Sequence, residues 1–221
     1  MAGSLVVVEP AKDWRAWHEA YTQPGSDLSR RVACVCCSES CRRGWTGPRG
    51  EALTVVSVCA GQGHDLLGVL AARDDADRVR ATLLEHDAGN VARAQSAVRL
   101  ADLRQVEIVQ ADAGELSTYD GLVPADLVLL AGVFGNISDA DVRRTIGALP
   151  QLCAPGGTVL WTRTRRDPDL TPAVRRWLQD EGFGEQAFLA PADVLFCLGV
   201  HRFMGVPRPL SGAGKLFQFL T

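Results

Sequence analysis

The feature that most constrains the fold is an apolar segment that runs directly into a glycine-containing turn and then into an amphipathic segment. Residues 55–58 read Val-Val-Ser-Val and are followed by Cys-Ala-Gly-Gln-Gly, with glycines at positions 61 and 63. Because glycine has no Cβ, the main chain can approach a ligand there, and a helix from about Asp65 to Ala72 would point its N-terminal amides at it. The pattern predicts a strand–turn–helix unit that binds a nucleotide-like molecule.

Acidic residues after the next two predicted strands narrow the choice of ligand. The second strand ends at Glu85, whose carboxylate can accept hydrogen bonds from both hydroxyls of a ribose. The third strand runs into Asp112, where a carboxylate could meet an adenine amino group. A dinucleotide fingerprint also needs a glycine three residues after Gly63, but that position is Leu66. The residues therefore favour S-adenosylmethionine, and an NAD(P)-dependent oxidoreductase of Rossmann type is the alternative.

Strand-like and helix-like segments alternate after the first turn, which predicts an α/β fold with a doubly wound sheet and helices on both faces. Ser138 can cap one helix, and Thr171 before Pro172 marks the start of another. Two strands around a short loop at residues 190–193 predict a closing hairpin. The expected later strands cover residues 81–84, 106–110, 125–132, 152–160, 186–189 and 194–203.

These motifs resemble those of the class I S-adenosylmethionine-dependent methyltransferases, over residues 53–203. The resemblance implies a Rossmann-like, seven-stranded, mostly parallel sheet with an antiparallel final strand, and methyl transfer that leaves S-adenosylhomocysteine as product. It implies that the glycine loop holds the methionine part of the cofactor and that Glu85 binds the ribose. It also implies that Asp112 and Ala113 bind the adenine and that the fourth strand ends near the methyl group. The expected cofactor-binding residues are Cys59, Ala60, Gly61, Gly63, Asp65, Glu85, His86, Asp112, Ala113, Gly132 and Phe134.

The chain departs from the family pattern at two positions of the first motif. Ser57 stands where an acidic residue is usual, and Cys59 replaces the first glycine. A non-catalytic protein that binds S-adenosylmethionine is therefore a further alternative. The loop after the fourth strand, residues 132–136, reads Gly-Val-Phe-Gly-Asn rather than Asn-Pro-Pro-Tyr, which argues against methylation of an amino group on a base or a glutamine amide. The expected acceptor is a small molecule, methylated at O or N.

Methyl transfer from a sulfonium is an in-line displacement, so alignment and exclusion of water matter most, and a base is needed only for a protonated acceptor. The candidate catalytic residues are His18, Tyr21, Asn136 and His201. Each has a structural alternative. His18 and Tyr21 lie on an aromatic helix that can pack against the domain or cover the pocket, Asn136 can cap a turn, and His201 can be a buried, hydrogen-bonded histidine.

Length and composition limit the number of domains and the kinds of partner that the chain can have. A chain of 221 residues, 47% of them hydrophobic, can form one core, with residues 1–50 as an N-terminal helical lid or extension and residues 51–221 as the cofactor-binding methyltransferase domain. The net charge of −3 gives no electrostatic footprint for nucleic acid. No apolar stretch is long enough for a membrane span or a signal-peptide core, so we expect a cytoplasmic monomer or homodimer without a membrane partner.

Four cysteines, at positions 34, 36, 37 and 41, raise the question of a metal site. Their spacing lacks the paired C-x-x-C knuckles that close a tetrahedral zinc site. On a helix, three of them share one face and can pack as small apolar residues. We therefore expect no metal.

Overall fold

The computed structural model describes residues 23, 26 and 52–220, and the expected lid with His18 and Tyr21, like the cysteine cluster at positions 34–41, lies outside them. The described strands are β1 (Leu53–Val58), β2 (Val79–Glu85), β3 (Val106–Gln110), β4 (Ala125–Leu130), β5 (Cys153–Thr164), β6 (Phe183–Leu189) and β7 (Phe196–Phe203). The described helices are α4 (His64–Ala71), α5 (Ala88–Leu100), α6 (Asp139–Leu152) and α7 (Thr171–Asp180), with short 3₁₀ turns at Ala76–Arg78 and Leu116–Tyr119.

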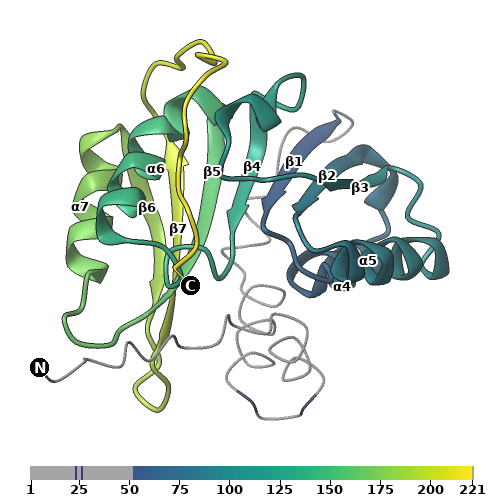
Figure 1. Cartoon of the computed structure of the whole chain (residues 1–221), viewed down its shortest axis with the longest axis horizontal. Helices are drawn as coiled ribbons and strands as arrows, with labels where there is room; N and C mark the ends of the chain where they lie inside the picture. The colour runs from purple at the N-terminus through teal and green to yellow at the C-terminus, as the bar shows by residue number, and fades with distance from the viewer. Residues whose placement is uncertain (1–22, 24–25, 27–51, 221) are drawn as a thin grey trace, which may run out of the picture.

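These strands form one sheet in the order β3-β2-β1-β4-β5-β7-β6 (Figure 1). Strands β1 to β5 pair in parallel, and β7 pairs antiparallel with both β5 and β6. The predicted α/β fold, with an antiparallel strand inserted near the end of a parallel sheet, is confirmed. Strand order reverses direction between β1 and β4, and in open α/β sheets ligands bind outside the carboxyl ends of the strands at such a point.

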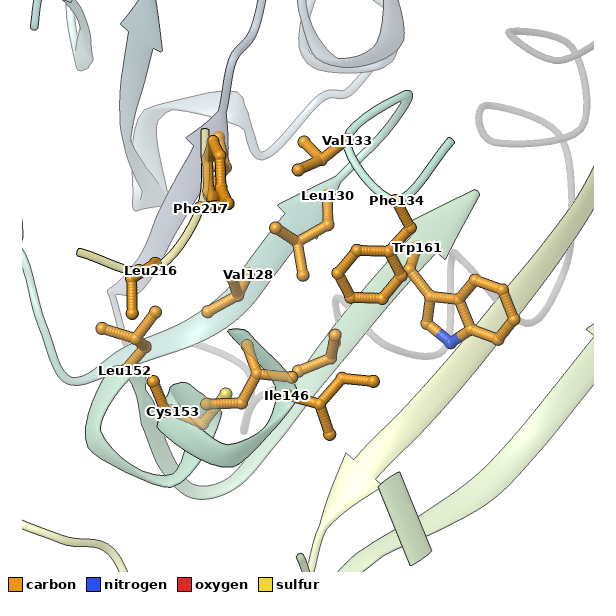
Figure 2. Packing of buried hydrophobic residues seen from close by; sticks show 14 of the residues in the cluster. Val128, Leu130, Val133, Phe134, Ile146, Leu152, Cys153, Trp161, Leu216 and Phe217 are labelled. Atoms are coloured by element: carbon orange, nitrogen blue, oxygen red, sulfur yellow. The ribbon is translucent and has the colours of Figure 1, made fainter. Parts of the chain in front are cut away.

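Both faces of the sheet are buried, because successive side chains of a strand point to opposite faces. In β4, Leu127 and Leu129 pack with α4 on one face, whereas Val128 and Leu130 pack with α6 and α7 on the other. Figure 2 shows this second core, in which Trp161 of β5 is fully buried. The apolar runs predicted as strands are therefore the centre of a sheet covered on both sides.

Side-chain caps fix where two of the helices begin. Asp87 accepts a hydrogen bond from the backbone N–H of Asn90 at 2.8 Å at the start of α5. Ser138 accepts one from the N–H of Asp141 at 3.1 Å at the start of α6, as predicted. Such caps satisfy backbone donors that have no partner within the helix. The cap on α5 matters for function because it comes directly after the end of β2.

The segment after β7 runs back beside α6 along the length of the sheet and reaches the carboxyl ends of the strands with its last described residues (Figure 1). Lys215 forms a β-bridge with Glu115 after β3, and Phe219 forms one with Ile137 after β4. The N–H of Leu216 donates to the carbonyl of Gly114 at 2.6 Å. We call residues 214–220 the C-terminal strap, because they tie the loop after β3 to the loop after β4.

Candidate functional site

A cavity of about 400 Å³ lies at the carboxyl ends of β1, β2, β3 and β4. Its position is the point where strand order reverses, and its size lies within the range of small-molecule pockets. The described residues that line it come from the four strand ends, from α4 and α5 and from the C-terminal strap. They are Cys59, Ala60, Asp65, Glu85, His86, Asp87, Asn90, Ala111, Asp112, Ala113, Ala131, Gly132, Lys215, Phe217, Gln218 and Phe219.

The glycine turn after β1 shapes one wall of this cavity. Cys59, Gly61 and Gly63 all have positive φ, of 52°, 58° and 80°. A Cβ on Gly63 would lie 2.7 Å from Cδ1 of Leu67, so a glycine is needed there to pack the turn against α4. Cys59 and Ala60 line the cavity, whereas Gly61 and Gly63 lie behind them. Cys59 adopts a left-handed conformation that a residue with a side chain rarely takes, which explains why glycine is usual at its position.

Glu85, at the end of β2, is held by two main-chain hydrogen bonds. Its Oε2 accepts from the N–H of Gly61 at 2.7 Å, and its Oε1 accepts from the N–H of Asp87 at 2.8 Å. Only 9% of the residue is exposed. A carboxylate fixed by backbone donors on two sides cannot turn away, so its remaining acceptor sites are fixed in direction as well.

Asp112, after β3, forms the opposite wall together with the C-terminal strap. Its Oδ1 accepts from the N–H of Gly114 at 2.8 Å, and its Oδ2 lies 3.8 Å from Nζ of Lys215. The same Nζ lies 3.2 Å from Oε1 of Glu115. All three charged side chains are 44–50% exposed, so these ion pairs are weak and exchange readily with water.

Carboxylates dominate the charge of the cavity. Asp65, Glu85, Asp87 and Asp112 line it, and Lys215 is the one side chain among the described lining residues that carries a fixed positive charge. Burial, together with the carboxylates of Glu85 and Asp112, raises the pKa of the Cys59 thiol, so that the thiol stays protonated at neutral pH. The cavity therefore favours a ligand with positive charge.

The loop after β4 closes the cavity through Ala131 and Gly132. The N–H of Gly132 donates to Oγ1 of Thr162 at 2.8 Å, and its carbonyl accepts from Nδ2 of Asn136 at 2.6 Å. The Asn136 side chain thus holds the loop that precedes it, whereas Ser138, not Asn136, caps the helix that follows. Phe134, expected at the cofactor, is fully buried beside Trp161 with ring centroids 5.9 Å apart (Figure 2). It does not line the cavity.

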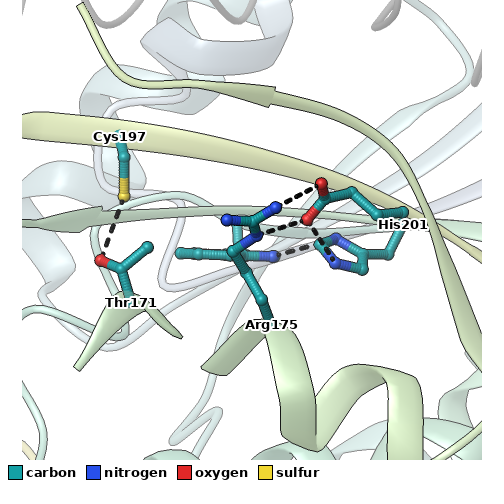
Figure 3. A network of polar contacts seen from close by, with 6 residues as sticks. Thr171, Arg175, Cys197 and His201 are labelled. Carbon is teal, nitrogen blue, oxygen red and sulfur yellow. Dashed lines mark hydrogen bonds and ion pairs between the residues drawn. The ribbon is translucent and has the colours of Figure 1, made fainter. Parts of the chain in front are cut away.

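The structure places His201 on β7, away from this cavity and beside a second one of about 740 Å³ between α7 and the β6–β7 hairpin. Its Nδ1 accepts from Nε1 of Trp161 at 3.3 Å, and its Nε2 lies 3.6 Å from Glu185, which Arg175 binds through two nitrogens (Figure 3). Burial lowers the pKa of His201 to about 4. A neutral histidine in the core corresponds to the structural alternative, so we do not propose His201 as a catalytic base.

Comparison with known proteins agrees with the fold. Residues 46–183 match the model of a protein family described as "Putative methyltransferase". The chain belongs to this family of methyltransferases. Membership implies S-adenosylmethionine as the methyl donor, and the class I fold expected from the sequence is confirmed by the sheet order and by solved structures. No curated protein matches the methyltransferase in sequence.

The methyltransferase is similar in structure to an O-methyltransferase family protein of Burkholderia thailandensis, with a TM-score of 0.66 and 18% identity, covering 86% of this chain and 59% of that one. A protein of Bordetella parapertussis described as a possible exported protein gives a TM-score of 0.64 at 18% identity, covering 88% and 80%. A precorrin-6y C5,15-methyltransferase of Geobacter metallireducens gives a TM-score of 0.53 at 14% identity, covering 81% of this chain and 89% of that one. Identities this low establish a shared fold alone.

Analysis of the sequence did not identify several residues of the cavity in this methyltransferase. The C-terminal strap contributes Lys215, Phe217, Gln218 and Phe219, and α5 contributes Asn90. Phe217 is 2% exposed and meets Phe219 edge to face at 5.8 Å. The apolar residues of the strap form too short a pattern to predict where the strap lies. The cap at Asp87, by contrast, could have drawn attention to Asn90 three residues later.

None of the described helices has the length and apolar character to cross a bilayer.

Proposed function

We propose that the methyltransferase binds S-adenosylmethionine in the cavity at the ends of β1 to β4 and transfers its methyl group to a small molecule at O or N. The observation that carries this proposal is the charge of the cavity, with four carboxylates against one ammonium group. S-adenosylmethionine carries a sulfonium and an ammonium group against one carboxylate. A dinucleotide carries a doubly negative pyrophosphate, which these carboxylates would repel.

The N-terminus of α4 supports the same choice of ligand. A dinucleotide fold places the pyrophosphate at the N-terminus of the helix after the glycine turn, where free amides and the helix dipole attract it. Asp65 lies in the first turn of α4, is buried and lines the cavity. Its carboxylate therefore opposes a phosphate at the place where a dinucleotide needs one, and suits a cationic amino-acid end.

Each wall of the cavity has one part of the donor to hold in this proposal. Glu85 receives the ribose hydroxyls, Asp112 and Ala113 face the adenine, and Asp65 with Cys59 and Ala60 surrounds the methionine end. Gly132, whose position Asn136 and Thr162 fix, lies where the methyl group leaves toward the acceptor. S-adenosylmethionine supplies an activated methyl group on a sulfonium, and the chain contributes alignment and removal of water.

Titration with two ligands tests the proposal. We expect isothermal calorimetry to detect binding of S-adenosylhomocysteine at micromolar concentrations, and to detect no binding of NADPH at the same concentrations. Transfer of a radiolabelled methyl group to a panel of small hydroxylated and aminated acceptors then tests turnover. Tighter binding of NADPH than of S-adenosylhomocysteine would show that the assignment of the ligand is wrong.

A further inference from the structure

The loop after β4 is fastened to the C-terminal strap through the main chain. The N–H of Leu220 donates to the carbonyl of Asn136 at 2.9 Å, next to the β-bridge between Phe219 and Ile137. Leu220 is not among the described residues that line the cavity, and 60% of it is exposed. Its contribution to the loop therefore comes from the backbone N–H rather than from the side chain.

Asn136 extends this contact to the wall of the cavity. Its Nδ2 donates to the carbonyl of Gly132 at 2.6 Å, and the N–H of Gly132 donates to Oγ1 of Thr162 at 2.8 Å. Gly132 itself lines the cavity. Both polar groups of the Gly132 backbone are therefore fixed, one by β5 and the other, through Asn136, by the C-terminal strap.

The other end of the C-terminal strap is anchored beside the loop after β3. The N–H of Leu216 donates to the carbonyl of Gly114 at 2.6 Å, and the N–H of Leu116 donates to the carbonyl of Gly214 at 2.8 Å. A Cβ on Gly114 would collide with the carbonyl oxygen of Phe217, so this close approach needs a glycine. The strap is held at both ends, so it can act as a fixed support for the loop after β4.

Methyl transfer and donor binding depend on different parts of the cavity in the proposed function. Transfer requires alignment, and a misplacement of about 1 Å can cost about 100-fold in rate. Binding relies on Glu85, whose hydrogen bonds go to the N–H groups of Gly61 and Asp87 and not to the loop after β4. A change in the position of Gly132 should therefore affect the rate of transfer more than the affinity for the donor.

We propose that Asn136 is a positioning residue, through which the C-terminal strap holds the Gly132 peptide in place for methyl transfer. The inference rests on the proposed function, because it places Gly132 where the methyl group leaves the donor. Leu220 supplies the N–H from the strap, and Asn136 acts through Gly132 rather than on the substrate. Breaking either link should slow transfer without releasing the donor.

Two substitutions break the connection at different hydrogen bonds. Leu220→Pro removes the N–H that binds Asn136, and the residue before it, Phe219, lies in a β-bridge, a conformation that suits a residue before proline. Asn136→Ala removes the donor to Gly132. We expect each variant to lower kcat about tenfold with the acceptor that the wild type methylates fastest. The Kd of S-adenosylhomocysteine, measured by calorimetry, should change less than about twofold.

Leu220→Ala is the conservative counterpart, because it keeps the N–H and truncates only an exposed side chain. We expect it to retain the kcat that Leu220→Pro loses. Hydrogen–deuterium exchange of residues 131–138 should be faster in Leu220→Pro and Asn136→Ala than in Leu220→Ala. The double variant Leu220→Pro/Asn136→Ala should lose about tenfold in kcat, as each single variant does, whereas independent effects would multiply to about 100-fold.

The outcomes separate this inference from the proposed function. Losses that multiply in the double variant, unchanged exchange of residues 131–138, or a loss of S-adenosylhomocysteine affinity as large as the loss in kcat would each overturn the positioning role of Asn136. All three leave the proposed donor site in place, because the wild type still binds S-adenosylhomocysteine. If the wild type does not bind it, the proposed function is overturned, and the inference with it.

Discussion

The two cavities of this molecule differ in what their polar side chains bind. At the ends of β1 and β2, Glu85 is held by main-chain donors, and each of its oxygens keeps capacity for a further hydrogen bond. Between α7 and the β6–β7 hairpin, the side chains bind one another, since Arg175 engages both oxygens of Glu185 and Trp161 donates to His201. The first arrangement leaves hydrogen-bonding capacity for a ligand, and the second uses most of it within the fold.

Size alone would favour the other cavity. The second cavity is the larger, about 740 Å³ against about 400 Å³, yet the donor site is proposed in the smaller one. The smaller cavity lies at the strand ends, and four carboxylates line it against one ammonium group among the described lining residues. The proposed location of the donor site therefore rests on unused hydrogen-bonding capacity and net charge, and not on volume.

The largest expected effect concerns stability and lies in the second region. Burial lowers the pKa of His201 to about 4 in the folded chain, against about 6.5 when unfolded. Between these pH values the unfolded chain binds a proton that the folded chain does not, so stability is full above pH 6.5 and falls as the pH drops toward 4. The neutral, buried state of His201 contributes about 3 kcal/mol to the free energy of unfolding at neutral pH. In His201→Gln, the free energy of unfolding should therefore fall less between pH 7 and 4 than in the wild type, as measured by urea unfolding followed by circular dichroism.

The control for this prediction is His86→Gln, which changes an exposed histidine at the other cavity. The free energy of unfolding of His86→Gln should fall with decreasing pH as that of the wild type does. Glu185 and Arg175 face His201, and the guanidinium of Arg175 lowers the pKa of Glu185. Protonation of this carboxylate at still lower pH therefore reduces the free energy of unfolding further, and it does so in every variant. An identical pH dependence in His201→Gln and wild type would contradict the buried, neutral state of His201.

A second prediction separates the two regions through a pair of glutamates. Glu85→Ala removes the acceptor for two ribose hydroxyls and should weaken binding of S-adenosylhomocysteine about 100-fold, because charged hydrogen bonds are the strong ones. Glu185→Ala makes the same change in the second cavity and should leave that affinity unchanged. Calorimetry on both variants gives the comparison. An equal effect of the two substitutions would mean that the cavities are coupled or that the donor site is misplaced.

The smallest expected effect concerns Lys215 on the C-terminal strap. Lys215→Ala removes the one fixed positive charge among the described lining residues and should strengthen binding of S-adenosylmethionine about two- to threefold at low salt. The gain should shrink in high salt and be smaller for S-adenosylhomocysteine, which lacks the sulfonium. Unfolding free energy should change by less than about 0.5 kcal/mol, because the ion pairs are half-exposed. Weaker binding of S-adenosylmethionine would refute the charge argument.

The fold could be predicted because its strands are buried on both faces and appear in the sequence as short apolar runs between turn residues. The predicted third strand, residues 106–110, matches β3, and Ser138 caps α6 as expected. Boundaries were less accurate where a strand continues beyond its apolar part. Thus β5 extends to Thr164 rather than ending at residue 160, because Thr162, Arg163 and Thr164 still pair with β7.

The candidate site was predicted in part, for a reason that separates residues at the end of a strand from residues further along a loop. Glu85 ends β2, and Asp112 and Gly132 lie two residues after β3 and β4, so sheet geometry brings all three to one edge, where they line the cavity. Phe134 and Asn136 lie a few residues further along the loop, where packing decides the direction of a side chain, and neither points into the cavity. Their placement depends on Trp161 and on the strap, far away in the sequence.

The C-terminal strap has a consequence for when this protein can recognise its ligand. Phe217 and Phe219 follow all seven described strands in chain order, yet they line the same cavity as Cys59. During vectorial synthesis the glycine turn emerges long before the aromatic pair does. The proposed donor site therefore gains its aromatic pair only after all seven described strands have been synthesised.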